Sequence, residues 1–198
     1  MSPTDILSEE HRVIEQVLDC VDRVSSRCAG GGGFDAESAL EAVDFLQHFA
    51  DQCHHGKEEG HLFPLLEARG LPHYVGPTAV MREEHEQGRR YLSVMAATIE
   101  PAKAGDHVAR EKFVAYANAY TRLLRDHIHK EDHCLFTMAK NLLNEEDCQT
   151  LLGAFQGSER DTGEGAHEHY LEVAHRLADR LGVCRSDVPG HCCGHAVR

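Results

Sequence analysis

Residues 53–59 read CHHGKEE, and residues 127–133 read HIHKEDH. In each stretch a glutamate follows a histidine by four positions. Positions i and i+4 of an α-helix lie on the same face, one turn apart. The two stretches therefore predict two helices, each presenting an imidazole and a carboxylate to the same neighbour.

The first pair is His54 with Glu58, and the second is His127 with Glu131. His55 lies three positions before Glu58, so this carboxylate can stand between two imidazoles. One such pair also occurs by chance on a solvated helix. Two pairs on separate helices indicate a metal site, because a carboxylate can bridge two ions through its two oxygens.

Single histidines lie at matching places in two further apolar segments. Residues 8–15, SEEHRVIE, contain His11, and residues 82–91, REEHEQGRRY, contain His85. A lone histidine is more often a surface or capping residue than a ligand. Together with the two pairs, however, these residues give each of four helices a donor. Mixed imidazole and carboxylate ligation is typical of non-haem iron, whereas structural zinc sites favour closed sets of thiolates.

Apolar residues recur at helical spacing over four long segments. The first runs from Ser2 toward Cys28, the second from Asp35 or Ser38 to Gly70, the third from Gly76 through Ile99, and the fourth carries apolar residues from Phe113 to Met138. Gly60 and Pro64 are expected to bend or locally break the second helix. Pro101 to Asp106 is expected to form a turn.

Two shorter helices are predicted to follow, one from Asn144 and one from near Gly163. We therefore expect an all-α protein, an up-down-up-down four-helix bundle with one or two additional short C-terminal helices. Residues 1–182 should form this single domain and residues 183–198 a flexible tail. The tail is rich in cysteine and histidine, but its spacing matches no paired CxxC site. Its metal-binding or thiol candidates are Cys184, His191, Cys192, Cys193 and His195.

Composition narrows the possible partners. The chain has 198 residues, a formal net charge of −13 and 16 histidines. Such an acidic chain offers no basic patch for nucleic acid and little attraction to an anionic membrane. No secretory signal and no apolar run of about 18 residues is visible, so we expect a cytoplasmic protein whose eight cysteines are thiols.

Several strings, taken together, resemble the hemerythrin-like (HHE cation-binding) domain. They are EEHRVIE, CHHGKEEGHLFPLLEARG, EEHEQGR, HIHKEDHCLF and GEGAHEHY. The resemblance extends from Thr4 to about Gly182 and excludes the tail. It implies a non-haem di-iron centre, two iron ions joined by an oxo or hydroxo bridge.

The resemblance also implies a role for each ligand. His11 and His54 would bind one iron, and His85 and His127 would bind the other, with His55 as a further ligand of the second iron. Glu58 and Glu131 would bridge the two ions. His167, in GEGAHEHY, is either an additional ligand from beyond the bundle or a polar residue of a packing helix.

The chain departs from the oxygen-carrying hemerythrins at two places. Those proteins show HxxxH on the third helix, but Met81 and Arg89 lie four residues either side of His85. They also show HxxxxD on the fourth helix, whereas this chain offers both Glu131 and Asp132. Spacing favours Glu131 as the bridge. Both departures argue against simple reversible oxygen carriage.

Three functions agree with these residues. The first is binding of oxygen or a related small oxidant, such as nitric oxide or peroxide, for sensing or detoxification. The second is an enzyme that disproportionates peroxide. The third is iron storage or iron sensing, in which metal occupancy controls folding and contacts with a separate, unidentified protein partner.

Overall fold

The computed structural model describes residues 1–162 and 165–186. Residues 163–164 and 187–198 lie outside this description, and with them His191, Cys192, Cys193 and His195 of the predicted tail. The six described cysteines are free thiols. Over the described residues, no helix combines the length and apolar character that a membrane span needs.

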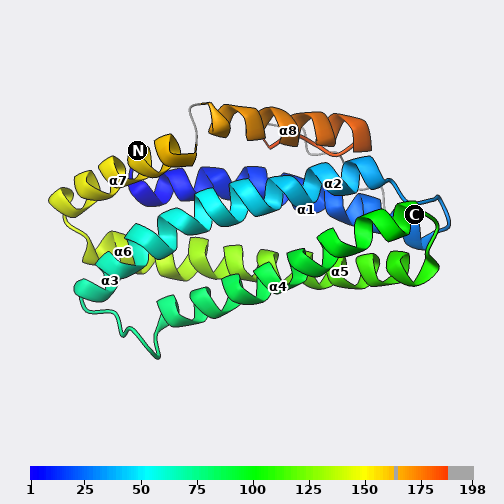
Figure 1. The fold of residues 1–198 in the computed structure, drawn as a ribbon. Helices are drawn as coiled ribbons and strands as arrows, with labels where there is room; N and C mark the ends of the chain where they lie inside the picture. The colour runs from blue at the N-terminus through cyan, green and yellow to red at the C-terminus, as the bar shows by residue number, and fades with distance from the viewer. Residues whose placement is uncertain (163–164, 187–198) are drawn as a thin grey trace, which may run out of the picture.

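The described chain is an all-α bundle, as predicted (Figure 1). Its long helices run antiparallel in sequence order, with α1 and the α2 helix above α4 and α5 in Figure 1. The first is α1 (Pro3–Ala29); the second comprises α2 (Ala36–Phe45), η1 (Leu46–His55), η2 (Glu58–Leu62) and α3 (Phe63–Ala68); the third is α4 (Pro77–Lys103); the fourth comprises α5 (His107–Lys130), η3 (Glu131–Leu135) and α6 (Phe136–Leu142).

Side chains cap three of these helices. The hydroxyl of Ser2 accepts a hydrogen bond from the Asp5 N–H, and the Asp5 carboxylate accepts one from the Ser2 N–H, so α1 begins with a capping box. Asp35 rather than Ser38 caps α2, because its carboxylate accepts a hydrogen bond from the Ser38 N–H. Asp106 caps α5 in the same way.

The second helix bends into wider turns but does not break at Gly60 and Pro64. Segments η1 and η2 are π-helical, and the Phe63 N–H bonds the Glu58 carbonyl five residues earlier. Pro64 lies at the start of α3. Its missing N–H costs little there, because the π-helical turns before it already depart from regular α-helical hydrogen bonding. The predicted turn at Pro101 also begins later than expected, since α4 continues to Lys103.

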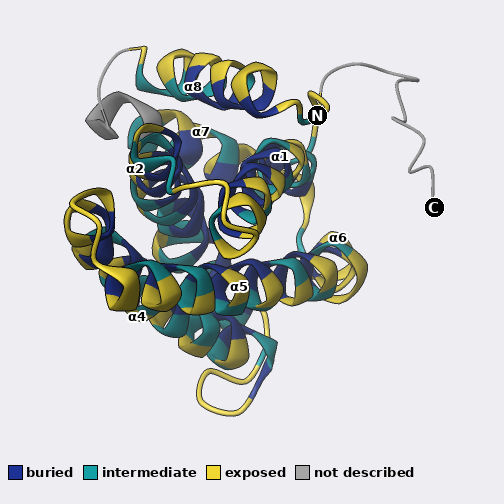
Figure 2. Cartoon of the chain, turned by 90° about the vertical axis from the view of Figure 1, so that its right-hand side faces the viewer, coloured by how far each residue is buried: buried dark blue, intermediate teal, exposed yellow. Residues whose placement is uncertain are grey.

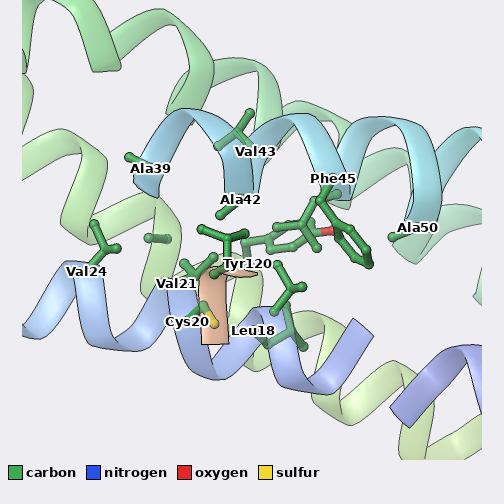
Figure 3. Packing of buried hydrophobic residues seen from close by; sticks show 14 of the residues in the cluster. Leu18, Cys20, Val21, Val24, Ala39, Ala42, Val43, Phe45, Ala50 and Tyr120 are labelled. Atoms are coloured by element: carbon green, nitrogen blue, oxygen red, sulfur yellow. The ribbon is translucent and has the colours of Figure 1, made fainter. Parts of the chain in front are cut away.

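The apolar core falls into two clusters along the bundle axis. The larger one lies between the halves of α1, α2, α4 and α5 far from α3, with Tyr120 and Phe45 at its centre (Figure 3). The smaller one includes Leu7, Leu62 and Leu135 and lies near α3 and α6. Buried residues follow the inward faces of the helices (Figure 2). On each long helix, histidines and carboxylates lie between the two clusters.

Two further helices complete the domain, α7 (Glu145–Thr162) and α8 (Ala166–Leu181). Helix α7 packs on η1 and η2, and its Asp147 forms a two-pronged ion pair with Arg69 beyond α3. Helix α8 covers the outer side of α1 and α2 (Figure 1). It buries Val173 and Leu177 in the larger core cluster. The C-terminal helices are therefore part of the same folding unit.

Replacing Leu177 by Ala should lower the free energy of unfolding by about 2–5 kcal/mol, because it leaves a cavity in the larger core cluster. Urea unfolding measures the change. Leu40→Ala is the matched control, since Leu40 is 56% exposed on α2 and its truncation should matter little. Equal effects of the two substitutions would show that α8 is not packed as described.

Candidate metal centre

Seven predicted ligands meet in the band between the two apolar clusters. Each is at most 4% exposed. They come from all four long helices and are His11, His54, His55, Glu58, His85, His127 and Glu131. Residues far apart in the sequence thus form one buried cluster of nitrogen and oxygen donors.

The donor atoms form two groups that share one carboxylate. One group contains His11, His54, Glu58 and Glu131, and the other contains His55, His85, His127 and Glu58. Within each group all donor atoms lie within 4.8 Å of one another. Such groups could each hold a metal ion, with Glu58 between the two positions.

Glu131 also reaches both sides of the cluster. Its Oε2 lies 3.2 Å from Nε2 of His11 and 3.2 Å from Nε2 of His127. The Glu58 oxygens lie 3.8 Å from Nε2 of His54 and 3.5 Å from Nε2 of His85. Each carboxylate therefore stands between histidines of different groups, which is the arrangement that a bridging ligand needs.

Four histidines, His11, His54, His85 and His127, point Nε2 toward the central carboxylates, and a carboxylate holds Nδ1 of each of the five site histidines. His54 is held by Glu10 at 2.9 Å and His127 by Glu84 at 3.0 Å. The same pattern applies to the other three. The pairs are His11 with Asp132 at 3.0 Å, His85 with Glu59 at 2.6 Å, and His55 with Asp51 at 3.4 Å. Such partners fix the tautomer and the ring orientation of a histidine ligand.

The centre has an approximate twofold repeat that relates α1 and the second helix to α4 and the fourth helix. His11 corresponds to His85, His54 to His127, and Glu58 to Glu131. Outside them, Glu10 pairs with Lys57 as Glu84 pairs with Lys130. Phe136 stacks on His11 as Phe63 stacks on His85, at 5.5 and 5.9 Å between ring centroids. His55, with Asp51 beside it, has no counterpart in this repeat.

Burial and mutual repulsion make the two central carboxylates costly without a cation. Burial raises the pKa of Glu58 well above its usual value, and the negative charge of Glu131 raises it further. Burial alone would raise the pKa of Glu131 too, but His127 and His11 hold it well below the usual range. Additional positive charge beside the pair therefore favours the ionised form of both carboxylates.

The pKa values of the site histidines are likewise shifted in opposite directions. Burial lowers the pKa of His55 to about 4, against the opposing hydrogen bond to Asp51. Burial would also lower the pKa of His127, but Glu131 and Glu84 raise it to about 9. Without a metal, protons on some of these histidines therefore partly neutralise the carboxylates. A metal ion would have to displace those protons, so its binding should depend on pH.

The donors present fit two cations of the iron type. All four oxygens of Glu58 and Glu131 are buried and make no hydrogen bond with any described residue. Buried oxygens of this kind need a compensating partner. Five imidazoles and two carboxylates, with no thiolate in either group, suit non-haem iron better than structural zinc.

The structure also shows where the residues that the sequence left open lie. Glu131 faces the centre, whereas Asp132 lies outside it and accepts hydrogen bonds from Ser8 and His11. His167 belongs to neither donor group; its ring lies 5.4 Å from that of Phe49. The structure therefore brings the other seven candidates together and places His167 outside both donor groups.

The contacts between the outer carboxylates and the site histidines were not among the predictions. Asp51 could have been found, because it precedes His55 by four positions on one helix. The other four hold a histidine of a different helix. Each of them is adjacent in sequence to a predicted ligand, which gave the only signal; they are Glu10, Glu59, Glu84 and Asp132.

Replacing Glu58 by Gln should remove most of the thermal stabilisation that added iron gives. The substitution removes a shared ligand, and it also relieves repulsion, so the chelator-treated variant should be no less stable than chelator-treated wild type. Thermal unfolding with chelator and with anaerobic Fe(II) measures both effects. Glu15→Gln, on the exposed side of α1, should respond to iron like wild type. A Glu58→Gln variant that gains as much stability from iron as wild type would rule out a ligand role.

His167→Ala should keep the wild-type metal content, because His167 lies outside both groups. His55→Ala should lose about one metal ion per chain, since it removes a donor from a group of four. Metal analysis of the two purified variants after identical loading makes the comparison. A loss in His167→Ala equal to that in His55→Ala would restore His167 to the ligand set.

Comparison with known proteins agrees with this geometry. Residues 2–139 match the model of the hemerythrin HHE cation-binding domain. The chain is 24% identical over 183 residues to the uncharacterized proteins Mb2018 of Mycobacterium bovis and Rv1995 of Mycobacterium tuberculosis, covering 92% of this chain and 71% of each relative. No solved structure matches it significantly. The match extends over all four ligand-bearing helices, and the chain therefore belongs to the hemerythrin HHE cation-binding family.

Proposed function

We propose that the protein holds two iron ions and binds oxygen or a related small oxidant, nitric oxide or peroxide, for sensing or detoxification. The observation that carries this proposal is the pair of donor groups joined by Glu58. His11, His54, Glu58 and Glu131 would hold one iron; His55, His85, His127 and the same two carboxylates would hold the other. When bound, such a centre supplies redox-active metal with exchangeable coordination positions.

The two positions differ in the number of histidines. One group offers two imidazoles, and the other offers three because His55 adds to it. With both carboxylates shared, the position with two imidazoles has fewer protein donors. The side of His11 and His54 would then offer the exchangeable position for a small ligand.

The surroundings favour a small ligand over a bulky substrate. Phe63 and Phe136 stack on site histidines, and Leu62 and Leu135 are buried beside them. These apolar side chains exclude water around the donors and leave the centre deeply enclosed. A diatomic gas or peroxide suits such a place better than an organic molecule.

Hydrogen bonding favours ligand binding over peroxide disproportionation. Proton transfer by an enzyme needs a group free to donate and accept protons near the reacting atoms. The five carboxylates around the histidines are each already bonded to Nδ1. They are thereby committed to orienting the histidines.

The test combines metal analysis with spectroscopy of the purified protein. We expect about two irons per chain, and the reduced protein should form a visible adduct with oxygen or nitric oxide. One zinc and no iron would overturn the di-iron assignment. Iron that oxidises without forming any adduct would overturn ligand binding.

The same preparation separates the other functions. Sustained oxygen release from peroxide, abolished in Glu58→Ala, would select the enzyme. Metal-free protein that is unfolded, and folds only with iron, would select a metal-gated switch.

A further inference from the structure

Arg89 lies outside the donor groups but contacts two of the carboxylates that hold histidines. Its Nε donates to Asp51 Oδ1 at 2.8 Å, and its Nη2 donates to Glu59 Oε1 at 2.8 Å. Its remaining terminal nitrogen bonds the exposed Glu86 at 2.6 Å. One guanidinium thus joins η1 and η2 of the second helix to α4.

The same two oxygens also receive histidine nitrogens. Asp51 Oδ1 accepts from Nδ1 of His55, and Glu59 Oε1 accepts from Nδ1 of His85. The two imidazole rings are stacked, with centroids 3.7 Å apart and planes 12° from parallel. A continuous hydrogen-bonded path therefore runs from one arginine, through two carboxylates, to two parallel rings.

Both histidines belong to the same donor group. We propose that Arg89 is a positioning residue for one metal position, the one that has three histidines, and that it sets the affinity of this position by fixing His55 and His85 through Asp51 and Glu59. This inference rests on the proposed di-iron function and adds a residue that touches neither metal position.

The other carboxylates around the centre have cations of their own. Lys57 holds Glu10 and Lys130 holds Glu84. Arg12 holds Asp132. Each of these three cations acts on one histidine, whereas Arg89 acts on two. Loss of Arg89 should therefore weaken one metal position far more than the other.

Only arginine supplies this geometry. Its guanidinium is planar and presents separate N–H groups in a fixed fork, so it can bond two carboxylates at once with defined directions. A lysine ammonium keeps the charge but behaves as a point donor. If orientation is the role, Arg89→Lys should recover only part of what Arg89→Gln loses.

The test is an anaerobic titration with Fe(II) in competition with a coloured chelator. In Arg89→Gln we expect one ion to bind with wild-type affinity and the second to bind about tenfold more weakly. A loss of about tenfold is at the lower end of what is seen when a residue that orients a metal ligand is removed. Arg89→Lys should lie between Arg89→Gln and wild type. Thermal unfolding of the metal-free proteins checks that each variant is folded.

Arg125→Gln is the matched control. Arg125 also joins two carboxylates, Asp19 and Asp22, each at 2.7 Å, and its side chain is 37% exposed compared with 31% for Arg89. It lies on α5 two positions before His127, but among the described contacts its partners Asp19 and Asp22 hold no histidine of the donor groups. Arg125→Gln should bind both ions with wild-type affinity.

The possible outcomes separate this inference from the proposed function. Wild type that fails to bind two irons would overturn the di-iron proposal itself. Wild type that binds two, with Arg89→Gln binding both equally well, would overturn the role of Arg89 alone. An equal loss in Arg89→Gln and Arg125→Gln would also overturn it, because the effect would then be one of surface charge.

Discussion

The structure depends on the burial of two carboxylates, Glu58 and Glu131, at the centre of a helical bundle, where histidine rings, and no other hydrogen-bond donors of the described chain, lie beside them. Moving an ionised carboxylate out of water costs several kcal/mol unless opposite charge accompanies it. Two such groups side by side add their repulsion to that cost. The five site histidines, and the cations that they can bind, are the compensation that makes this core possible.

Helix geometry is adapted to that burial at equivalent places. The Glu58 carbonyl accepts a hydrogen bond from Phe63, and the Glu131 carbonyl accepts one from Phe136, both five residues later. In each case the widened turn lets a central carboxylate and a stacking phenylalanine face the same interior. π-Turns are often found at functional sites. Here the π-turns change the helical spacing between each ligand glutamate and the apolar residues that follow it.

Helical periodicity predicted the bundle. The spacing of His54–Glu58 and His127–Glu131, the single histidines of the other two helices and the family resemblance together predicted the seven clustered residues. Periodicity and spacing are local signals, since they depend on which residues share one helix face. The π-turns could not be predicted, because a proline and a glycine indicate only that a helix is disturbed. Contacts such as Glu10 with His54 also escaped prediction. They join residues of different helices, so no spacing within one segment encodes them.

Negative and positive side chains alternate outward from the centre, and this alternation explains how the residues of the site are arranged. Seven carboxylates surround the five histidines: Glu58, Glu131, Glu10, Asp51, Glu59, Glu84 and Asp132. All but Glu58 and Glu131 are outer carboxylates, and four cations hold them, namely Arg12, Lys57, Arg89 and Lys130. With neutral histidines, this set retains three negative charges. Two divalent ions more than balance them and leave one positive charge. In the proposed di-iron centre, a hydroxide or another small anion held with the two ions would neutralise that charge.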